Sequence, residues 1–168
     1  AYNGVLYDSH VLEIRGSMEF GGANAKLQGN NASTIEITAT GVVELDTTGS
    51  GFDGNSATAK LVNHGTIAVT AVGNHHITHI VENHGTISIG TGATLTANAT
   101  AKPFTNEGTI TGTGTFFSDR FVAGSTPFTH QADAVLDVAT LRIGSTANGA
   151  STVLTGPIGV ANLEIQNG

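Results

Sequence analysis

Histidines are the residues of this sequence best suited to chemistry. Five of the seven histidines lie between positions 64 and 84, namely His64, His75, His76, His79 and His84. A neutral imidazole binds Zn²⁺, Cu²⁺ or Ni²⁺, and three imidazoles on one face of a strand can hold such an ion. His75 and His79 are four residues apart, so they would share a face of an extended strand.

The candidate metal ligands are therefore His64, His75, His79 and His84. The alternative interpretation is a row of polar turn residues that is exposed to water, and this is the interpretation that we favour. We accordingly expect no metal and no other cofactor. A further hypothesis is a response to acid, because stacked imidazoles resist joint protonation at about pH 6.

Carboxylates are the second group of residues that could do chemistry. Glycoside hydrolysis needs two carboxyl groups about 5 to 9.5 Å apart. Glu36 with Glu44, or Glu107 with Asp119, could meet across neighbouring coils of a repetitive fold. The alternative is that these carboxylates are simply solvated. The Ser, His and Asp residues form no nucleophile motif such as Gly-x-Ser-x-Gly, so we expect no enzymatic activity.

A repeated segment must position the histidines. The copies are Asn63-His64-Gly65-Thr66-Ile67, Asn83-His84-Gly85-Thr86-Ile87 and, more loosely, Asn106-Glu107-Gly108-Thr109-Ile110. Asn and Gly tolerate positive φ, so each copy can begin with a sharp turn. The alternation that follows predicts a short, half-buried strand. A period near 20 residues indicates stacked coils. In such a stack His64 and His84 would lie about 4.8 Å apart.

A triplet of apolar, polar and apolar residues runs through the whole chain. The clearest examples are Leu12-Glu13-Ile14, Met18-Glu19-Phe20, Ile35-Glu36-Ile37, Val43-Glu44-Leu45, Ile67-Ala68-Val69, Ile87-Ser88-Ile89, Leu136-Asp137-Val138, Leu141-Arg142-Ile143 and Leu163-Glu164-Ile165. Each triplet would point two side chains inward and one outward. We predict an all-β fold over residues 1–168, a single right-handed parallel β-solenoid of about 20–24 residues per coil. The alternative is a β-sandwich or jelly roll, which also uses many short strands.

The composition excludes several classes of protein. Charged residues make up 11% of the chain, which is too few for amphipathic helices. There is no Cys, so there is no disulfide framework. The net charge is −7 with only six scattered Lys and Arg, so we expect no nucleic-acid partner. No apolar run approaches the ~18 residues of a membrane span, so we expect no membrane insertion. Ala1 is expected to be a processed or truncated start.

Two segments depart from the repeat. Residues 1–10 hold both Tyr residues, and we predict a cap or a donated strand there. Residues 115–130 form a predicted Phe-rich insert, and we expect a surface contact at Phe116, Phe117, Phe121 and Phe128.

The ends of a solenoid expose unpaired backbone groups and apolar side chains, which must be covered. The last triplet reaches almost to residue 168, and no capping helix is recognisable. We therefore predict a homo-oligomer, a head-to-tail polymer. The assembly residues would be Tyr2, Val5, Leu6, Tyr7, Leu163 and Ile165.

The repeats resemble those of known proteins. The runs VNHGTIAVT, VENHGTISIG and FTNEGTITGTG are similar to repeats of bacterial secreted β-helices, of the filamentous-haemagglutinin and autotransporter-passenger type. The resemblance is best over residues 30–115. It implies a parallel β-solenoid outside the cell or on its surface, serving as adhesin, stalk or filament. It brings no catalytic residue, and the Gly-Gly-x-Gly-x-Asp repeats that bind calcium are missing.

The expected function is therefore structural: a secreted, self-assembling surface filament or adhesin subunit. One alternative is a β-helix that binds or depolymerises carbohydrate, as phage tailspikes do, with host or matrix glycans as partners. A third possibility is ice binding, because Thr66, Thr86 and Thr109 would stack in a row.

Overall fold

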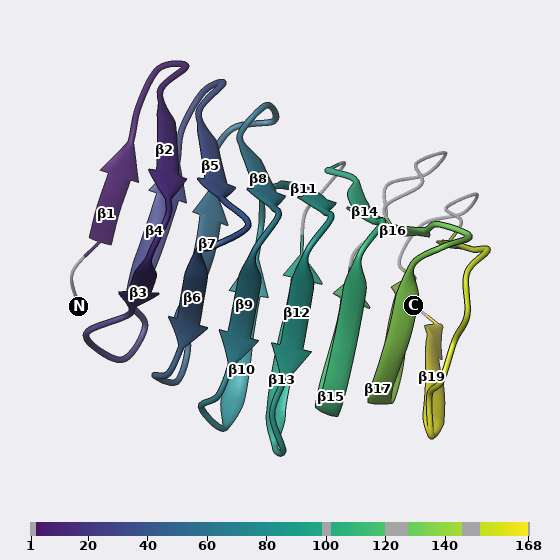
Figure 1. Cartoon of the computed structure of the whole chain (residues 1–168). Helices are drawn as coiled ribbons and strands as arrows, with labels where there is room; N and C mark the ends of the chain where they lie inside the picture. Colours follow the sequence, from purple (N-terminus) through teal and green to yellow (C-terminus); the bar gives the residue numbers. More distant parts are fainter. Residues whose placement is uncertain (1–2, 99–101, 120–127, 146–151, 168) are drawn as a thin grey trace.

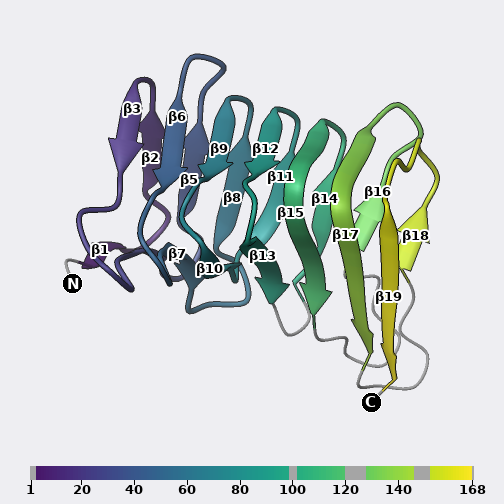
Figure 2. The same ribbon diagram turned by 90° about the horizontal axis from the view of Figure 1, so that it is seen from below.

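The computed structural model describes residues 3–98, 102–119, 128–145 and 152–167. These residues form β-strands, turns and bends, and none of them forms a helix that could cross a membrane. The strands wind into a three-sided rod with β1 at one end and β19 at the other (Figure 1; Figure 2).

Each side of the rod is a stack of parallel strands. Face 1 contains β1 (Asn3–Leu6), β4 (Lys26–Gly29), β7 (Gly51–Gly54), β10 (Gly73–Ile77), β13 (Ala93–Asn98) and β19 (Asn162–Asn167). Face 2 contains β2 (Val11–Ile14), β5 (Thr34–Ile37), β8 (Lys60–Asn63), β11 (Ile80–Asn83), β14 (Phe104–Asn106), β16 (Phe128–His130) and β18 (Thr152–Leu154). Face 3 contains β3 (Ser17–Glu19), β6 (Val42–Leu45), β9 (Thr66–Val69) and β12 (Thr86–Ile89).

Two long strands turn a corner of the rod. They are β15 (Thr109–Asp119) and β17 (Val135–Ser145). The first half of β15 pairs with β12 on face 3, and its second half pairs with β13 on face 1. The register shifts between Gly112 and Thr115, where the strand bends, and Gly112 has a φ of 125°. Glycine adopts this conformation without the strain that a side chain would bring.

Every pairing between the described strands is parallel and joins one coil to the next. The shortest coils pair Thr66 with Thr86, 20 residues on, and the longest pair Thr34 with Lys60, 26 residues on. The predicted parallel β-solenoid is confirmed, with coils up to two residues longer than expected. A sandwich or jelly roll is excluded, because its strands pair mostly antiparallel.

The triplets point as predicted in the middle of the rod. In β5, for example, Ile35 and Ile37 are 0% exposed and Glu36 lies on the outer surface between them. At the last coil Leu163 and Ile165 still occupy inward positions, but they are 55% and 66% exposed. No further coil covers them in the part of the chain that the structure describes.

The predicted Phe-rich surface is wrong for Phe116 and Phe128. Both side chains are 0% exposed, and their ring centroids lie 5.1 Å apart in the core. Phe116 pairs with Leu95 and Phe128 pairs with Phe104, so both occupy regular inward positions of the solenoid. Phe117 points outward, as the alternation of a strand requires. Phe121 lies outside the described residues.

Candidate functional site

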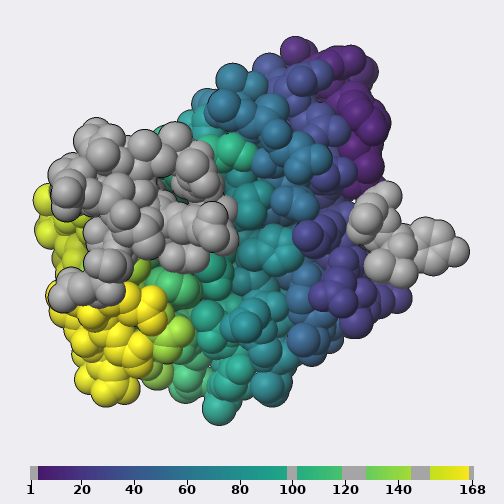
Figure 3. Space-filling model, turned by 180° about the vertical axis from the view of Figure 1, so that it is seen from behind, coloured from purple at the N-terminus to yellow at the C-terminus, as the bar shows by residue number. Residues whose placement is uncertain are grey.

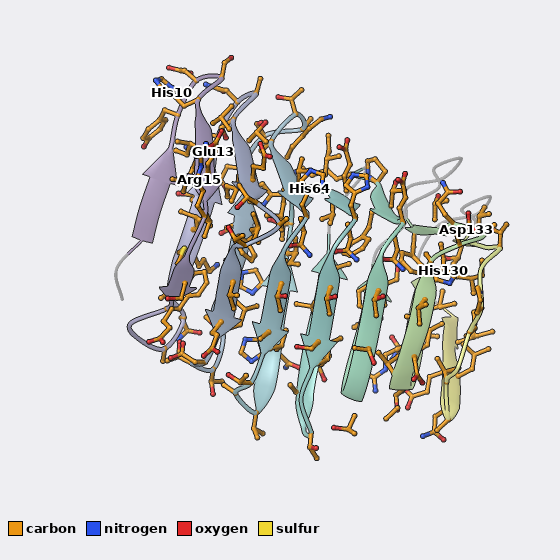
Figure 4. All side chains as sticks on the ribbon, in the orientation of Figure 1. His10, Glu13, Arg15, His64, His130 and Asp133 are labelled. Carbon is orange, nitrogen blue, oxygen red and sulfur yellow. The ribbon has the colours of Figure 1, made fainter. Side chains whose placement is uncertain are left out.

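The repeated Asn-x-Gly motif forms one long edge of the rod. β8 ends at Asn63 and β9 begins at Thr66, so His64 and Gly65 turn the corner between faces 2 and 3 (Figure 4). A side chain on Gly65 would overlap the carbonyl oxygens of Gly41 and Thr38. The coils approach each other this closely only because glycine has no Cβ.

The asparagines of the motif turn into the rod and form an amide ladder of Asn63, Asn83, Asn106 and His130. All four side chains are 0% exposed. Asn63 Nδ2 donates to Asn83 Oδ1 at 2.7 Å, and Asn83 Nδ2 donates to Asn106 Oδ1 at 2.6 Å. These bonds satisfy buried polar groups that would otherwise be costly.

The ladder also determines which ring nitrogen of His130 carries the proton. Asn106 Nδ2 lies 3.0 Å from His130 Nδ1, and His130 Nε2 lies 3.0 Å from the carbonyl oxygen of Pro157. An amide nitrogen can only donate and a carbonyl can only accept, so His130 is neutral with its proton on Nε2. The sequence reveals Asn at the same position in three repeats, but turn propensity alone does not predict that its side chain points inward.

A corner row of His64, His84 and Glu107 lies on the outer surface above the ladder. The rings of His64 and His84 stack with centroids 4.9 Å apart and planes 11° apart, which confirms the predicted ladder. His84 Nδ1 lies 3.1 Å from Glu107 Oε2. The row therefore combines two imidazoles and a carboxylate that are accessible from solvent.

An open pocket of about 440 Å³ adjoins the corner row. It is lined by Glu107 together with Gln131, Ala132 and Asp133 from the turn that follows β16. Two carboxylates and an amide are groups that suit a hydroxylated or cationic small molecule.

His75 and His79 lie elsewhere, inside the rod beneath face 1. They are 0% and 1% exposed, so they belong neither to the corner row nor to an exposed face. His75 contacts Ser50 Oγ at 3.3 Å and the carbonyl oxygen of Ala71 at 2.9 Å. Among the described residues, no group of three or more His, Asp or Glu is arranged to hold a metal ion. The structure thus does not bring the four candidate ligands together.

His79 occupies space that a glycine leaves open. A Cβ on Gly29 would lie 2.6 Å from His79 Nε2 and 3.0 Å from Ser33 Oγ. Neither ring nitrogen of His79 has a hydrogen-bond partner among the described residues. Burial, with a smaller contribution from the charge of Lys102, lowers the pKa of His79 to about 4. The imidazole is therefore neutral at physiological pH.

A charged cluster of Lys26, Asp53, His76 and Lys102 lies at the outer side of this region. Lys26 Nζ is 3.2 Å from Asp53 Oδ2, and Lys102 Nζ donates to the carbonyl oxygens of Thr78, at 2.7 Å, and of Gly54. Burial lowers the pKa of Lys102 and of His76. For Asp53, burial acts to raise the pKa, but hydrogen bonds from Lys26 and Thr78 outweigh it, and the pKa lies below its usual value. Lys26 lies in β4, Asp53 in β7 and His76 in β10, and Lys102 follows β13, so the cluster connects four successive coils.

The carboxylates Glu36 and Glu44 do not meet across neighbouring coils. Glu36 points outward from face 2 and Glu44 from face 3, so they lie on different sides of the rod. Of the second pair, Glu107 Oε2 lies 3.1 Å from His84 Nδ1, and the side chain of Asp119 lies outside the described residues.

The predicted assembly residues lie at the ends of the rod. Val5 and Tyr7 are 39% and 58% exposed, whereas Leu6 packs against the core. Leu163 and Ile165 belong to the last strand, at the opposite end (Figure 3). Tyr2 lies outside the described residues.

Comparison of the chain with protein-family models, with curated proteins and with solved structures found no match.

Proposed function

We propose that this chain is a structural subunit that assembles end to end into an extracellular filament or surface adhesin. The observation that supports the proposal is that the strands at each end of the rod pair on one side only. Within the described residues, β1, β2 and β3 each pair only with a later strand, and β18 and β19 pair only with an earlier one. Both end coils therefore offer free backbone donors and acceptors to another chain.

The end surfaces are also apolar. At the last coil Ile158, Leu163 and Ile165 are 42%, 55% and 66% exposed, and at the first coil the inward residues Leu12 and Met18 are only partly buried. Burying apolar area contributes about 25 cal/mol per Å², and strand pairing adds the directional specificity. The low charge, the absence of Cys and the resemblance to secreted β-helix repeats support a location outside the cell.

A charge placed at the end should block this assembly. Ile165→Lys puts an ammonium group in the last coil, so a joining copy would have to bury it. We expect sedimentation velocity to show masses that grow with concentration for the unaltered chain and a monomer for Ile165→Lys. Ser88→Lys, on the side of the rod, is the matched control and should assemble normally. A monomer for the unaltered chain at all concentrations would contradict the proposal.

A second candidate function is glycan contact at Phe117. Its ring lies on the outer side of face 1 beneath the guanidinium of Arg142, which is 5.3 Å from the ring centroid and donates to Glu164 Oε2 at 2.6 Å. An aromatic ring flanked by charged groups suits a sugar. Glycan-array binding that Phe117→Ala abolishes would support this function, and unchanged binding would exclude it.

We do not propose ice binding. Thr66, Thr86 and Thr109 do stack in register on face 3, but Val42 pairs before them and Val135 pairs after them. The threonine row therefore spans only three coils.

A further inference from the structure

Within the described parts of the chain, the three faces of the rod differ in their number of strands. Face 1 has eight strand positions, from β1 to β19. Face 2 has seven, from β2 to β18. Face 3 also has seven, from β3 to the single bridge between Leu136 and Ile158. The inference below rests on the end-to-end assembly proposed above, because the extra strand on face 1 limits how two copies can stack.

Stacked copies must meet on all three faces at the ordinary strand spacing of about 4.8 Å. When β2 and β3 of an incoming copy lie on β18 and Ile158, the incoming β1 falls at the height already filled by β19, because β1 precedes β2 by less than one coil. If β1 lies on β19 instead, faces 2 and 3 are each left with a gap one strand wide.

We propose that β1 is a displaceable cap: it leaves face 1 when a second copy docks, and β4 takes its place on β19. Each inward column of side chains then continues through the junction with apolar contacts. Leu154 meets Ile14 on face 2, and Ile158 meets Met18 on face 3. On face 1, Ile165 meets Leu27. Within one chain the successive strand pairings already place these two residues at the two ends of the same inward column.

β1 is the weaker of the two competing strands. It has four residues and β19 has six. Gly4 occupies an inward position of β1 without a side chain, so Leu27 beneath it remains 7% exposed. β19 is held by the ion pair of Glu164 with Arg142 at 2.6 Å. The turn after β1 holds Asp8 and Ser9 at φ values of 47° and 56°, a region that side chains rarely adopt.

The chain contains no Cys, so an engineered disulfide can lock β1 cleanly. Val5 and Gln28 are paired on the outer side of β1 and β4, where neighbouring Cα atoms suit a disulfide. The variant is Val5→Cys with Gln28→Cys. The matched control is Glu82→Cys with Thr105→Cys, an outward pair on face 2 in the middle of the rod.

We expect the oxidised β1-locked variant to remain monomeric in sedimentation velocity and to assemble once reduced, whereas the control assembles in both states. A deletion of residues 1–7 should assemble at a concentration about tenfold lower than the full chain does. An oxidised locked variant that assembles like the full chain would overturn the displaceable cap and leave end-to-end assembly intact. If neither the full chain nor the deletion assembles, both proposals are wrong.

Discussion

The buried histidine at position 79 makes the stability of the rod depend on pH. Its pKa is about 4 in the folded chain, against 6.5 in the unfolded chain. Between these two values the unfolded state binds more protons, so acid favours unfolding. His79 alone should cost about 3 kcal/mol of the free energy of unfolding as the pH falls from 7 to 4.

Urea unfolding at pH 7 and at pH 4.5 measures this loss. His79→Leu cannot be protonated, so its stability should fall less between the two values than that of the unaltered chain. His64→Gln, in the exposed corner row, should fall as much as the unaltered chain. Equal losses for the unaltered chain and His79→Leu would show that His79 does not sense pH.

Removing one hydrogen-bond donor from the amide ladder should destabilise the folded chain. Asn83→Asp keeps the size and the acceptor, but the carboxylate cannot donate to Asn106 Oδ1 and adds a buried charge. We expect a loss of at least about 2 kcal/mol in the free energy of unfolding. Asn74→Asp, at an exposed position of β10, is the control and should change stability by less than about 0.5 kcal/mol. Similar small effects at both positions would mean that the ladder contributes little.

At the scale of elements, glycine sets the distance between coils. A Cβ on Gly85 would overlap the carbonyl oxygen of Gly65, whereas a Cβ on Gly22 meets no atom within 4 Å. Gly85→Ala should therefore lower the free energy of unfolding by roughly 2 to 3 kcal/mol, and Gly22→Ala should leave it nearly unchanged. Thermal unfolding of the two variants tests this difference. An equal effect would show that the corner can relax.

The strands of this rod can be predicted from the sequence where the alternation of apolar and polar residues matches the burial in the fold. The triplet of Ile35, Glu36 and Ile37 alternates with a period of two, and the fold buries it accordingly. The stack of His64 on His84 follows from the repeat alone. Both predictions need only the periodicity of a strand and the spacing of coils.

The predictions that failed depend on contacts between coils. His79 enters the core because Gly29, fifty residues earlier in the chain, leaves space for its ring. Phe116 is buried because it continues a column of inward side chains, although the nearby Phe residues suggest an exposed cluster. Neither of these contacts can be predicted from a short stretch of the sequence, because each joins residues of different coils.

At the scale of the whole molecule, the described strands pack closely along the length of the rod. Among these strands, each inner coil is covered above and below by its neighbours, whereas the first and last described coils are covered on one side only. The side surfaces carry charges that discourage lateral pairing, such as Glu36 and Glu44. Growth should therefore occur along the axis of the rod and not sideways.

Negative-stain electron microscopy of the purified chain at neutral pH tests end-to-end assembly most directly. We predict unbranched filaments one rod wide that lengthen with protein concentration. Short, isolated rods at every concentration would contradict the account and would direct attention to Phe117 and to the pocket beside Glu107.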